Sequence, residues 1–495
     1  MHLKVIYLGR MTRWIVGAGG FVLTLGASSL AGATPSRAWG TYYGGASYEQ
    51  AVDVDFTSGP AIDVVGRTES SSGIATLGSH DNGYSGDDAF VAQFDGTGAR
   101  VWATYYGGAG EDAFNALVHN QSDDIYAFGT TSSTGFIATL GAHQTTLSGG
   151  LDGMLVKFNT SGTRTWGTYF GGNGLDQGLG ICVAATGTVY IVGNTSSTNL
   201  ATVGAHQTSK GGDYDGFVAK VTSSGSVLWT TYYGGNDADV DHTYARDCAV
   251  DSSNNVYVVG ETLADNGIAT TGAHDTTLGG PGDAFLVKFN TNGVRQWGTY
   301  FGGPSGDAGH AVDVDASGNV YIAGDTISSS GIATTGAHDT TLTSGYDAFL
   351  AKFNASGVRQ WSTYFGGSQS SGGSFTEEFN DIEVFESNIY LSGRTSSDAG
   401  VVTTGAWDSS NLAGKQVGMF VQFTTAGVLT FASFNGQEDD MTVSDAYAGV
   451  AVSREGLGQA AIVGRTNASS GVATAGAHDT TFNGAHDGVI TYINL

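Results

Sequence analysis

The sequence is poor in proline, cysteine and basic residues. It has 4 prolines, 2 cysteines, and 19 lysines and arginines against 46 aspartates and glutamates in 495 residues. So few cysteines exclude a disulfide-rich scaffold, and the formal net charge of −27 argues against a nucleic-acid-binding surface. Beyond the first 33 residues there is no apolar run long enough for a membrane-spanning helix. Glycine, by contrast, is abundant at 79 residues, and 11% of the residues are aromatic.

An aromatic segment ending in Gly-Gly recurs through the chain at intervals of 63 to 70 residues. Its copies start at Trp39, Trp102, Trp166, Trp229, Trp297, Trp361 and, in a weaker form, Phe431. A fixed period of this length indicates an array of units that bury their apolar faces against one another. The sequence therefore contains seven copies of one structural unit.

The fifth copy shows what each unit contains. Residues 311–315 alternate as a strand does, 320–324 and 347–353 are rich in β-forming residues, and 358–365 carry the aromatic segment. Turn-forming residues such as Ala316-Ser-Gly-Asn319 separate them. Four short antiparallel strands per unit predict an all-β fold, a β-propeller with four-stranded blades.

The two ends of the chain predict how the ring closes. The first unit begins with an unpaired fourth strand, Trp39 to Gly45, and the last unit stops at its third strand, residues 487–493. If the N-terminal strand completes the C-terminal blade, seven whole blades form and no long sheet edge is left open. We therefore predict one seven-bladed propeller domain over residues 34–495.

These motifs together resemble a known family. The order Asp-x-x-Gly-Asn-Val-Tyr-x-x-Gly-x-Thr, Ala-Thr-Thr-Gly-Ala, Asp-Ala-Phe-Leu-x-Lys-Phe and Trp-x-Thr-Tyr-Phe-Gly-Gly is similar to the bacterial SBBP repeat, named for a seven-bladed β-propeller. The resemblance extends over residues 39 to 495. It implies a secreted or surface-located bacterial protein and a fold, but hardly any site.

Residues 1–33 have the features of a signal peptide. Lys4, Arg10 and Arg13 precede an apolar, glycine-rich stretch, and Ala31-Gly-Ala33 has the form of a cleavage site. We expect a secreted, periplasmic or cell-surface protein with no membrane span once this segment is removed. Cys182 and Cys248 fall in the first strands of adjacent units but one residue out of register, so we expect two buried thiols rather than a disulfide.

Meander connectivity gives the propeller two unlike faces. The turns between the first and second strands, and between the third and fourth, are tight, as at Asn290-Thr-Asn-Gly293. The other face, called here the looped face, carries the long second-to-third connections such as 328–346 and the links between blades. Because binding residues tend to lie on loops held by a rigid scaffold, we expect the site there.

The sixth unit differs most from the others and supplies the first candidate site. It has Trp407 where six units have a histidine, and Phe375 and Phe379 lie in or beside the longest inter-blade link. Exposed aromatic rings there would stack on a sugar or contact a partner protein. Repeat drift is the alternative. The six histidines, which we expect to pack structurally, are His80, His143, His206, His274, His338 and His478.

A second candidate lies before the fourth unit. Asp237, Asp239 and Asp241 alternate in an enlarged link, a pattern that can wrap oxygen ligands around calcium. The glycine and the bidentate glutamate of a complete calcium loop are missing, so a solvated acidic rim is the alternative. Apart from calcium, nothing indicates a cofactor.

Motifs that carry catalysis are missing. The sequence lacks His-Glu-x-x-His, Gly-x-Ser-x-Gly, a Walker loop and Cys-x-x-Cys. We therefore expect no catalysis but a binding or interaction module, a monomer that contacts a protein or glycan partner and no nucleic acid. The alternative is a carbohydrate-active hydrolase or lyase with its site on the same looped face.

Overall fold

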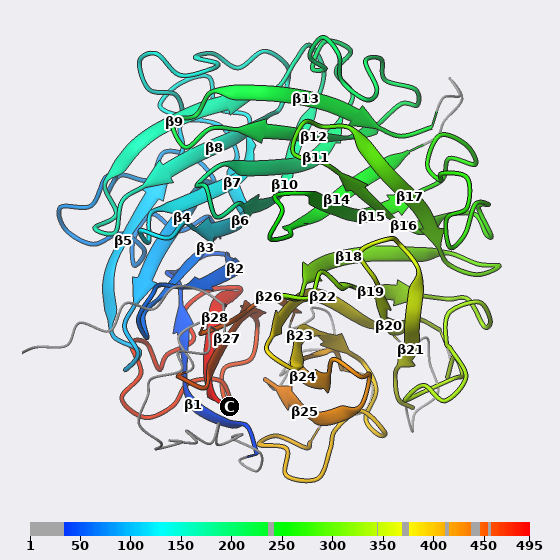
Figure 1. Ribbon diagram of the computed structural model, residues 1–495. Helices are drawn as coiled ribbons and strands as arrows, with labels where there is room; N and C mark the ends of the chain where they lie inside the picture. Colours follow the sequence, from blue (N-terminus) through cyan, green and yellow to red (C-terminus); the bar gives the residue numbers. More distant parts are fainter. Residues whose placement is uncertain are drawn as a thin grey trace, which may run out of the picture. The chain divides into compact units, whose positions relative to one another are not determined.

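Pro35–Leu495 forms one compact unit, a ring of seven four-stranded antiparallel sheets (Figure 1). The computed structural model describes residues 34–235, 242–343, 345–368, 376–410, 415–436, 446–453 and 457–495. Within these ranges the regular elements are all strands, and no helix is long and apolar enough to cross a membrane. The predicted all-β, seven-bladed propeller is confirmed.

Each blade runs from an inner strand at the axis to an outer strand at the rim. The strands of blades one to three are β2 (Glu49–Phe56), β3 (Ile62–Thr68), β4 (Asp88–Phe94), β5 (Arg100–Tyr106); β6 (Asp112–His119), β7 (Ile125–Thr131), β8 (Asp152–Phe158), β9 (Arg164–Phe170); β10 (Asp176–Val183), β11 (Val189–Thr195), β12 (Asp215–Val221) and β13 (Val227–Tyr233). Those of blades four to six are β14 (Thr243–Val250), β15 (Val256–Thr262), β16 (Asp283–Phe289), β17 (Arg295–Phe301); β18 (Asp307–Val314), β19 (Val320–Thr326), β20 (Asp347–Phe353), β21 (Arg359–Phe365); β22 (Glu377–Phe385), β23 (Asn388–Thr395), β24 (Val417–Thr424) and β25 (Leu429–Asn435). Blade seven joins β26 (Ala446–Val452), β27 (Gln459–Thr466) and β28 (Asp487–Asn494) to β1 (Ser36–Tyr43).

The middle strands of each blade are apolar on both faces because each sheet packs between two neighbours. In β16 every residue except Lys288 is buried, and in β19 every residue except Asp325. Such continuous burial explains why these segments are rich in Val, Ile and Phe instead of alternating with polar residues. The core is therefore a series of layers between blades, not one central mass.

The ring closes as the sequence predicts. Strand β1 pairs with β28 from Trp39 opposite Tyr492 to Tyr43 opposite Gly488, so the two ends of the chain share blade seven (Figure 1). Trp39 also stacks on Tyr492, with ring centroids 5.1 Å apart. The outer strand of the last blade thus comes from the start of the chain.

Outer strands lock neighbouring blades together through their tryptophans. Trp229, on β13, lies over Gly293 in the β16–β17 turn of the next blade, and its Nε1 donates to the carbonyl of Thr291 at 3.2 Å. Gly293 has φ of +76°, and a methyl group there would lie 3.0 Å from the indole, so only glycine suits both the turn and the ring. The same contact recurs at Gly98, Gly162, Gly225, Gly357 and Gly427.

Blade six needs no such tryptophan. The next blade carries the two ends of the chain where the other blades have their third-to-fourth turn. Phe431 stands at the tryptophan position and is 1% exposed. Its difference from the repeat therefore follows from ring closure.

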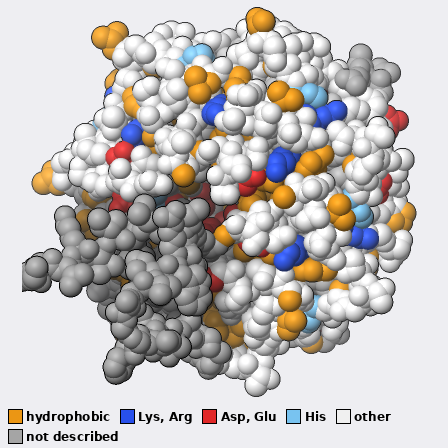
Figure 2. All heavy atoms as spheres, in the orientation of Figure 1, with side chains coloured by type: hydrophobic (Ala, Val, Ile, Leu, Met, Phe, Trp, Pro, Cys, Tyr) orange, Lys and Arg blue, Asp and Glu red, His pale blue; other side chains and the backbone are white. Residues whose placement is uncertain are grey.

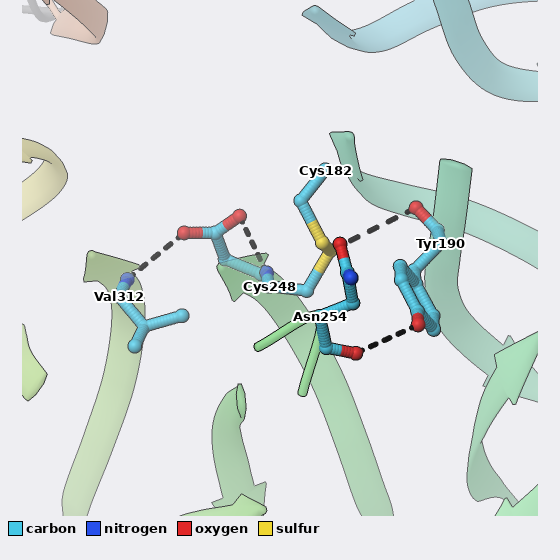
Figure 3. Close-up of a disulfide and its surroundings, with 6 residues drawn as sticks. Cys182, Tyr190, Cys248, Asn254 and Val312 are labelled. Carbon is cyan, nitrogen blue, oxygen red and sulfur yellow. Dashed lines mark hydrogen bonds between the residues drawn. A yellow bond between two sulfur atoms is a disulfide. The ribbon is translucent and has the colours of Figure 1, made fainter. Parts of the chain in front are cut away.

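Inner strands are tied across the junctions by carboxylates. Asp247 accepts the amide of Cys248 on its own strand and, at 2.9 Å, the amide of Val312 on the next inner strand (Figure 3). Asp53, Asp313 and Asp381 bridge to the next blade in the same way. Each carboxylate therefore completes backbone hydrogen bonds that no sheet provides at the axis.

A disulfide ties the junction between blades three and four, where we expected separate thiols. Cys182 and Cys248 are bonded, with their Cα atoms 5.8 Å apart (Figure 3). Alternate residues of an inner strand face opposite neighbours, so cysteines offset by one residue point toward each other across the junction. The offset that argued against a bond is the geometry that permits it.

The long connections of the looped face also cover the rim. In blade one the amide of Thr76 donates to the carbonyl of Ala103 on β5 at 2.9 Å, and the amide of Tyr105 donates to the carbonyl of Asp81. These bonds use the otherwise free edge of the outer strand. The connection therefore protects the blade from edge-to-edge pairing with another chain.

Candidate ligand-binding cavity in the central channel

A cavity of about 480 Å³ lies among the inner strands. Its walls are formed by Val52, Asp53, Asn115, Ala116, Leu179, Gly180, Arg246, Asp247, His310, Glu378, Asn380, Asp381, Arg394 and Ala448. Most of these residues hold the fourth or fifth position of an inner strand, while Glu378 and Arg394 lie closer to the inter-blade links. The cavity therefore lies about midway along the channel.

The walls of this cavity break the sevenfold repeat. Each inner strand bends at a bulge after its second or third residue, as between Gly309 and Ala311. The residue at the bulge differs in almost every blade: Val52, Asn115, Leu179, Arg246, His310, Asn380 and Ala448. Outer-strand residues repeat closely from blade to blade. The side chains that differ between blades are therefore concentrated around the channel.

Three adjacent blades each place an ion pair at the cavity wall. Arg246 contacts Glu261 at 2.6 Å in blade four, and His310 contacts Asp325 at 2.5 Å in blade five. In blade six, Arg394 contacts Glu378 at 2.7 Å. Each pair joins an inner strand to the strand beside it, so the pairs form a charged sector over blades four to six.

Within this sector one group has the composition of a metal site. One ligand atom from each of His310, Asp325 and Glu378 lies within 4.8 Å of the others. In the structure, however, Asp325 is paired with the imidazole and Glu378 with Arg394. The same atoms provide a histidine and two carboxyl groups for proton transfer.

Deeper in the channel three carboxyl groups share an unfavourable environment. Burial raises the pKa of Asp53 and Asp247 to about 7, although each accepts two backbone amide bonds. Burial, followed by repulsion from Asp53 and Asp247, raises the pKa of Asp381 well above its usual range. Because these groups repel one another across the channel, a positive group placed between them is favoured.

The cavity therefore has an acidic character. Its wall contains the carboxyl groups of Asp53, Asp247, Glu378 and Asp381 against the two guanidinium groups of Arg246 and Arg394. Acidic side chains are visible in the hollow at the centre of the face shown in Figure 2. Both arginines are already paired with glutamates.

The structure assigns a packing role to two residues of the predicted aromatic site. Phe379 is fully buried, with its ring centroid 5.1 Å from that of Phe365, so it offers no surface to a ligand. Trp407 is half-buried and packs on Phe420 and Phe431 at 5.6 and 5.2 Å. Phe375 lies outside the described residues, as do Asp237, Asp239 and Asp241 of the predicted calcium site and residues 1–33.

The repeated histidines pack against the next blade. His274 lies with its ring centroid 5.7 Å from that of Phe353, and His338 lies 5.6 Å from Phe423. Burial lowers the pKa of His274 and His338. Trp407, at the corresponding sequence position in blade six, packs instead on Phe420 and Phe431 of its own blade.

Sequence reasoning missed the channel residues. Arg246, His310 and Glu378 lie in three different repeats, and nothing in one copy sets them apart. An alignment of the seven copies would have given a signal, because the residue at the bulge differs in almost every copy. A search for catalytic motifs along the chain cannot detect side chains that come together only when the ring folds.

The solved structures that match this chain differ widely in their described properties. A polysaccharide lyase of family PL25, an ulvan lyase, is 13% identical over 86% of this chain and 92% of its own, with a TM-score of 0.46. A protein of unknown function from Dyadobacter fermentans is 9% identical over 81% and 98%, with a TM-score of 0.37. The calcium-binding protein regucalcin from Agrobacterium tumefaciens is 9% identical over 72% and 86%, with a TM-score of 0.30. Because the similarity is this low, the function has to be inferred from the residues of this chain.

Among curated protein sequences none matches significantly. The family model described as the SBBP beta-propeller repeat matches residues 228–268 and 296–331. The two matches span the outer strand of blade three with the first half of blade four, and the outer strand of blade four with the first half of blade five. The chain therefore carries the SBBP beta-propeller repeat at residues 228–268 and 296–331.

Proposed function

We propose that this propeller is a secreted or cell-surface binding module that receives a basic group of a partner protein in the channel cavity. One observation carries the proposal: the residues that depart from the repeat line one cavity in the central channel. Repeated residues maintain the ring, whereas residues that differ between copies are free to serve recognition. The protein acts as a monomer in this proposal.

The charge of the cavity supports a basic ligand. Asp53, Asp247 and Asp381 have pKa values raised by burial, so a neighbouring lysine or arginine side chain would favour their ionised forms. Arg246 and Arg394, held by Glu261 and Glu378, would position carbonyl or carboxylate groups that flank the basic side chain. A partner loop carrying a lysine or an arginine fits this arrangement.

Titration calorimetry with short peptides tests the proposal. A tetralysine peptide should bind, a tetraglutamate peptide should not, and the double variant Asp247→Asn with Asp381→Asn should weaken binding at least tenfold. Asn292→Ala, on an exposed tight turn of the opposite face, is the control and should bind like the parent. Equal affinity for both peptides, or loss of binding in the control variant, would contradict the proposal.

A carbohydrate-active hydrolase or lyase is the second candidate function. The His310–Asp325 contact of 2.5 Å, with a glutamate nearby, favours it because a histidine held by a carboxylate can move a proton. Incubation with acidic and neutral polysaccharides, followed by assay of reducing ends and of unsaturated uronate products, tests it. Activity in the parent that is lost in His310→Asn would favour this candidate over pure binding.

A further inference from the structure

The junction between blades five and six brings a histidine and two carboxyl groups together at the wall of the channel cavity. His310 and Asp325 belong to blade five, on β18 and β19, and Glu378 belongs to β22, the inner strand of blade six. One ligand atom of each lies within 4.8 Å of the other two. Among the residues that the structure describes, no other set of three histidine, cysteine, aspartate or glutamate side chains is this close.

Strand geometry holds these three side chains in place. His310 is the extra residue of the bulge in β18, and its Nε2 lies 2.5 Å from Oδ1 of Asp325 on the neighbouring strand. Glu378 is the second residue of β22 and is paired with Arg394 on β23. All three groups therefore lie on strands of the ring, and side chains held by rigid elements form more precise sites than side chains on loops.

The corresponding positions at the two neighbouring junctions do not offer such a set. These positions are the bulge residue, the residue before the last threonine of the second strand, and the second strand residue on the next blade's inner side that faces it. They are filled by Arg246, Glu261 and Ala308 between blades four and five, and by Asn380, Arg394 and Ala446 between blades six and seven. Both junctions thus have an arginine and an alanine where the junction of blades five and six has only groups that can ligate a metal ion.

We propose that His310, Asp325 and Glu378 bind a zinc ion that joins blades five and six. Zinc takes imidazole nitrogen and carboxylate oxygen in tetrahedral sites, and an open site has three protein ligands with water in the fourth position. None of the three groups is a thiolate, the ligand that selects copper(I) or an iron–sulfur cluster. Calcium and magnesium prefer oxygen ligands alone, so they would leave the imidazole unused.

The contact between His310 and Asp325 needs only a small change to admit the ion. Ligand atoms around a tetrahedral zinc ion lie about 3.3 Å apart, so the two side chains have to separate by about 1 Å from their contact of 2.5 Å. Zinc then takes the place of the proton between Nε2 and the carboxylate, and that proton leaves to solvent. The hydrogen-bonded pair is therefore the metal-free form of the site.

Glu378 can ligate the ion without leaving Arg394. Nε of Arg394 lies 2.7 Å from Oε1 of Glu378, and Nη2 donates to Oε2 at 2.9 Å. A carboxylate has about four lone-pair sites, and the arginine uses two of them. A hydrogen-bonded partner of this kind fixes the orientation of a ligating carboxylate. Arg394 is then a positioning residue for the metal site.

The ion can reach this site from the cavity. His310 and Glu378 line the cavity, and the side chains of His310, Asp325 and Glu378 are 19, 15 and 16% exposed. Asn380 lines the same wall, and its buried Oδ1 accepts no hydrogen bond from any residue that the structure describes. An ion held by three ligands keeps its fourth position for a water molecule or another oxygen from the cavity.

The acidic cavity favours a divalent cation at its wall. Asp381 lies three residues after Glu378 on β22 and lines the same cavity. Burial, followed by repulsion from Asp53 and Asp247, raises the pKa of Asp381 well above its usual range. A nearby zinc ion offsets this repulsion. The zinc ligands differ from the aspartates proposed to receive a basic group, so the two kinds of binding can be tested separately.

Zinc binding to the chelator-treated protein is the first measurement. Titration calorimetry with ZnCl₂ should show about one site per chain, and CaCl₂ should bind more weakly. Cobalt(II) in place of zinc should give the visible absorption bands of a tetrahedral ion, which report ligation directly. Absence of zinc binding, or a response to calcium equal to that to zinc, would overturn the proposal.

Substitutions that the repeat already contains test each ligand. Asparagine occupies the His310 position in two other blades and the Asp325 position in one, and glutamine occupies the Glu378 position in two. These residues are Asn115, Asn380, Asn194, Gln50 and Gln177. His310→Asn, Asp325→Asn and Glu378→Gln should therefore fold, and each should weaken zinc binding by at least about tenfold. A variant among the three that folds and binds zinc as the parent does would overturn the proposed set.

His338→Asn is the matched control for a histidine outside the site. His338 lies in the same blade and packs against Phe423, so this variant should bind zinc like the parent. Loss of zinc binding in His338→Asn and not in His310→Asn would move the metal to the repeated histidines and overturn the proposal. The tetralysine titration is performed in chelator, so failure of zinc binding and failure of peptide binding are recorded independently.

Discussion

Contacts between blades are copied from junction to junction at the rim of the ring but vary at its axis. At the rim, one contact is copied from blade to blade: a tryptophan over a glycine turn, as Trp229 lies over Gly293. At the axis the ties vary: four junctions use a carboxylate, another uses the amide of Asn115, and another uses the Cys182–Cys248 bond. Copied contacts hold the blades at a constant spacing, and this leaves the inner strands free to diverge.

This difference explains where function can reside. A substitution in the rim contact disturbs a geometry that six junctions share, whereas a substitution at an inner bulge changes only one wall of the channel. The charged sector of blades four to six consists of such inner-strand residues and the partners beside them. Stability should therefore depend most on closure and on the rim, and ligand binding on the axis.

Deleting residues 34–45 is the strongest way to break the ring. The deletion removes β1, including the buried Tyr42 and Tyr43, and exposes the edge of β28. Truncating large buried aromatic residues costs roughly 3 to 5 kcal/mol each, so we expect melting to fall by more than about 10 °C. Circular dichroism on heating measures it. A variant that melts like the parent would show that closure contributes little.

Trp297→Ala tests the rim contact. Trp297 is half-buried, lies over Gly357 and donates to the carbonyl of Ala355. We expect a loss of roughly 3 kcal/mol in urea unfolding, against about 1 kcal/mol for His338→Ala in the more exposed histidine ring. Equal losses would contradict the view that the tryptophans, and not the histidines, hold the rim.

Replacing both cysteines by alanine tests the axis. The pair closes a long loop between blades three and four, so we expect the variant to lose about 2 to 4 kcal/mol. Asp247→Asn, one junction further, should cost only about 1 kcal/mol because the amide oxygen can still accept one backbone bond. Urea unfolding compares them. The reverse order would mean that carboxylates tie the inner strands more firmly than the disulfide.

His119 makes the junction between blades one and two sensitive to pH. Burial lowers the pKa of His119, but Asp55 and Asp63, 3.1 and 2.8 Å from its two nitrogens, outweigh burial and raise it to about 10. A raised pKa gives stability that is complete below the unfolded value of 6.5 and is lost as pH rises through about 10.

The measurement is thermal melting between pH 7 and pH 10.5. The parent should lose about 2 kcal/mol more over this range than His119→Val, since the corresponding residues Val183 and Val250 cannot titrate. The variant itself is less stable at pH 7 because it leaves two aspartates without a counter-charge. Parallel pH profiles for the two proteins would contradict the assigned ion pairs.

The sequence predicted the fold because its evidence is periodic. Seven copies of the aromatic segment and an offset of one strand at the ends determine the blade number and the pairing of Trp39 with the last blade. Strand limits were less accurate: the predicted strand 311–315 is the second half of β18, which begins at Asp307. The bulge after Gly309 hides the first half because it interrupts the alternation of apolar residues.

The site could not be predicted from the same evidence. Arg246, His310 and Glu378 are 64 or more positions apart in the sequence, and only the closed ring brings them to one wall. Phe379 was interpreted as a surface aromatic, yet it faces the adjacent blade and is fully buried. The cysteine offset was misjudged for the same reason, since residues of an inner strand have to be assigned to the neighbour that each one faces.

Pairing of β1 with β28 also has a consequence for the order in which the strands can assemble. The first strand of the propeller to be synthesised, β1, can pair only after its partner Asp487–Asn494 has been made. A ribosome that stops early, or a protease that trims the tail, therefore leaves a chain with an unpaired strand at one end and an open sheet at the other. A chain that lacks β1 or β28 therefore exposes a sheet edge, whereas pairing of the two strands covers both edges.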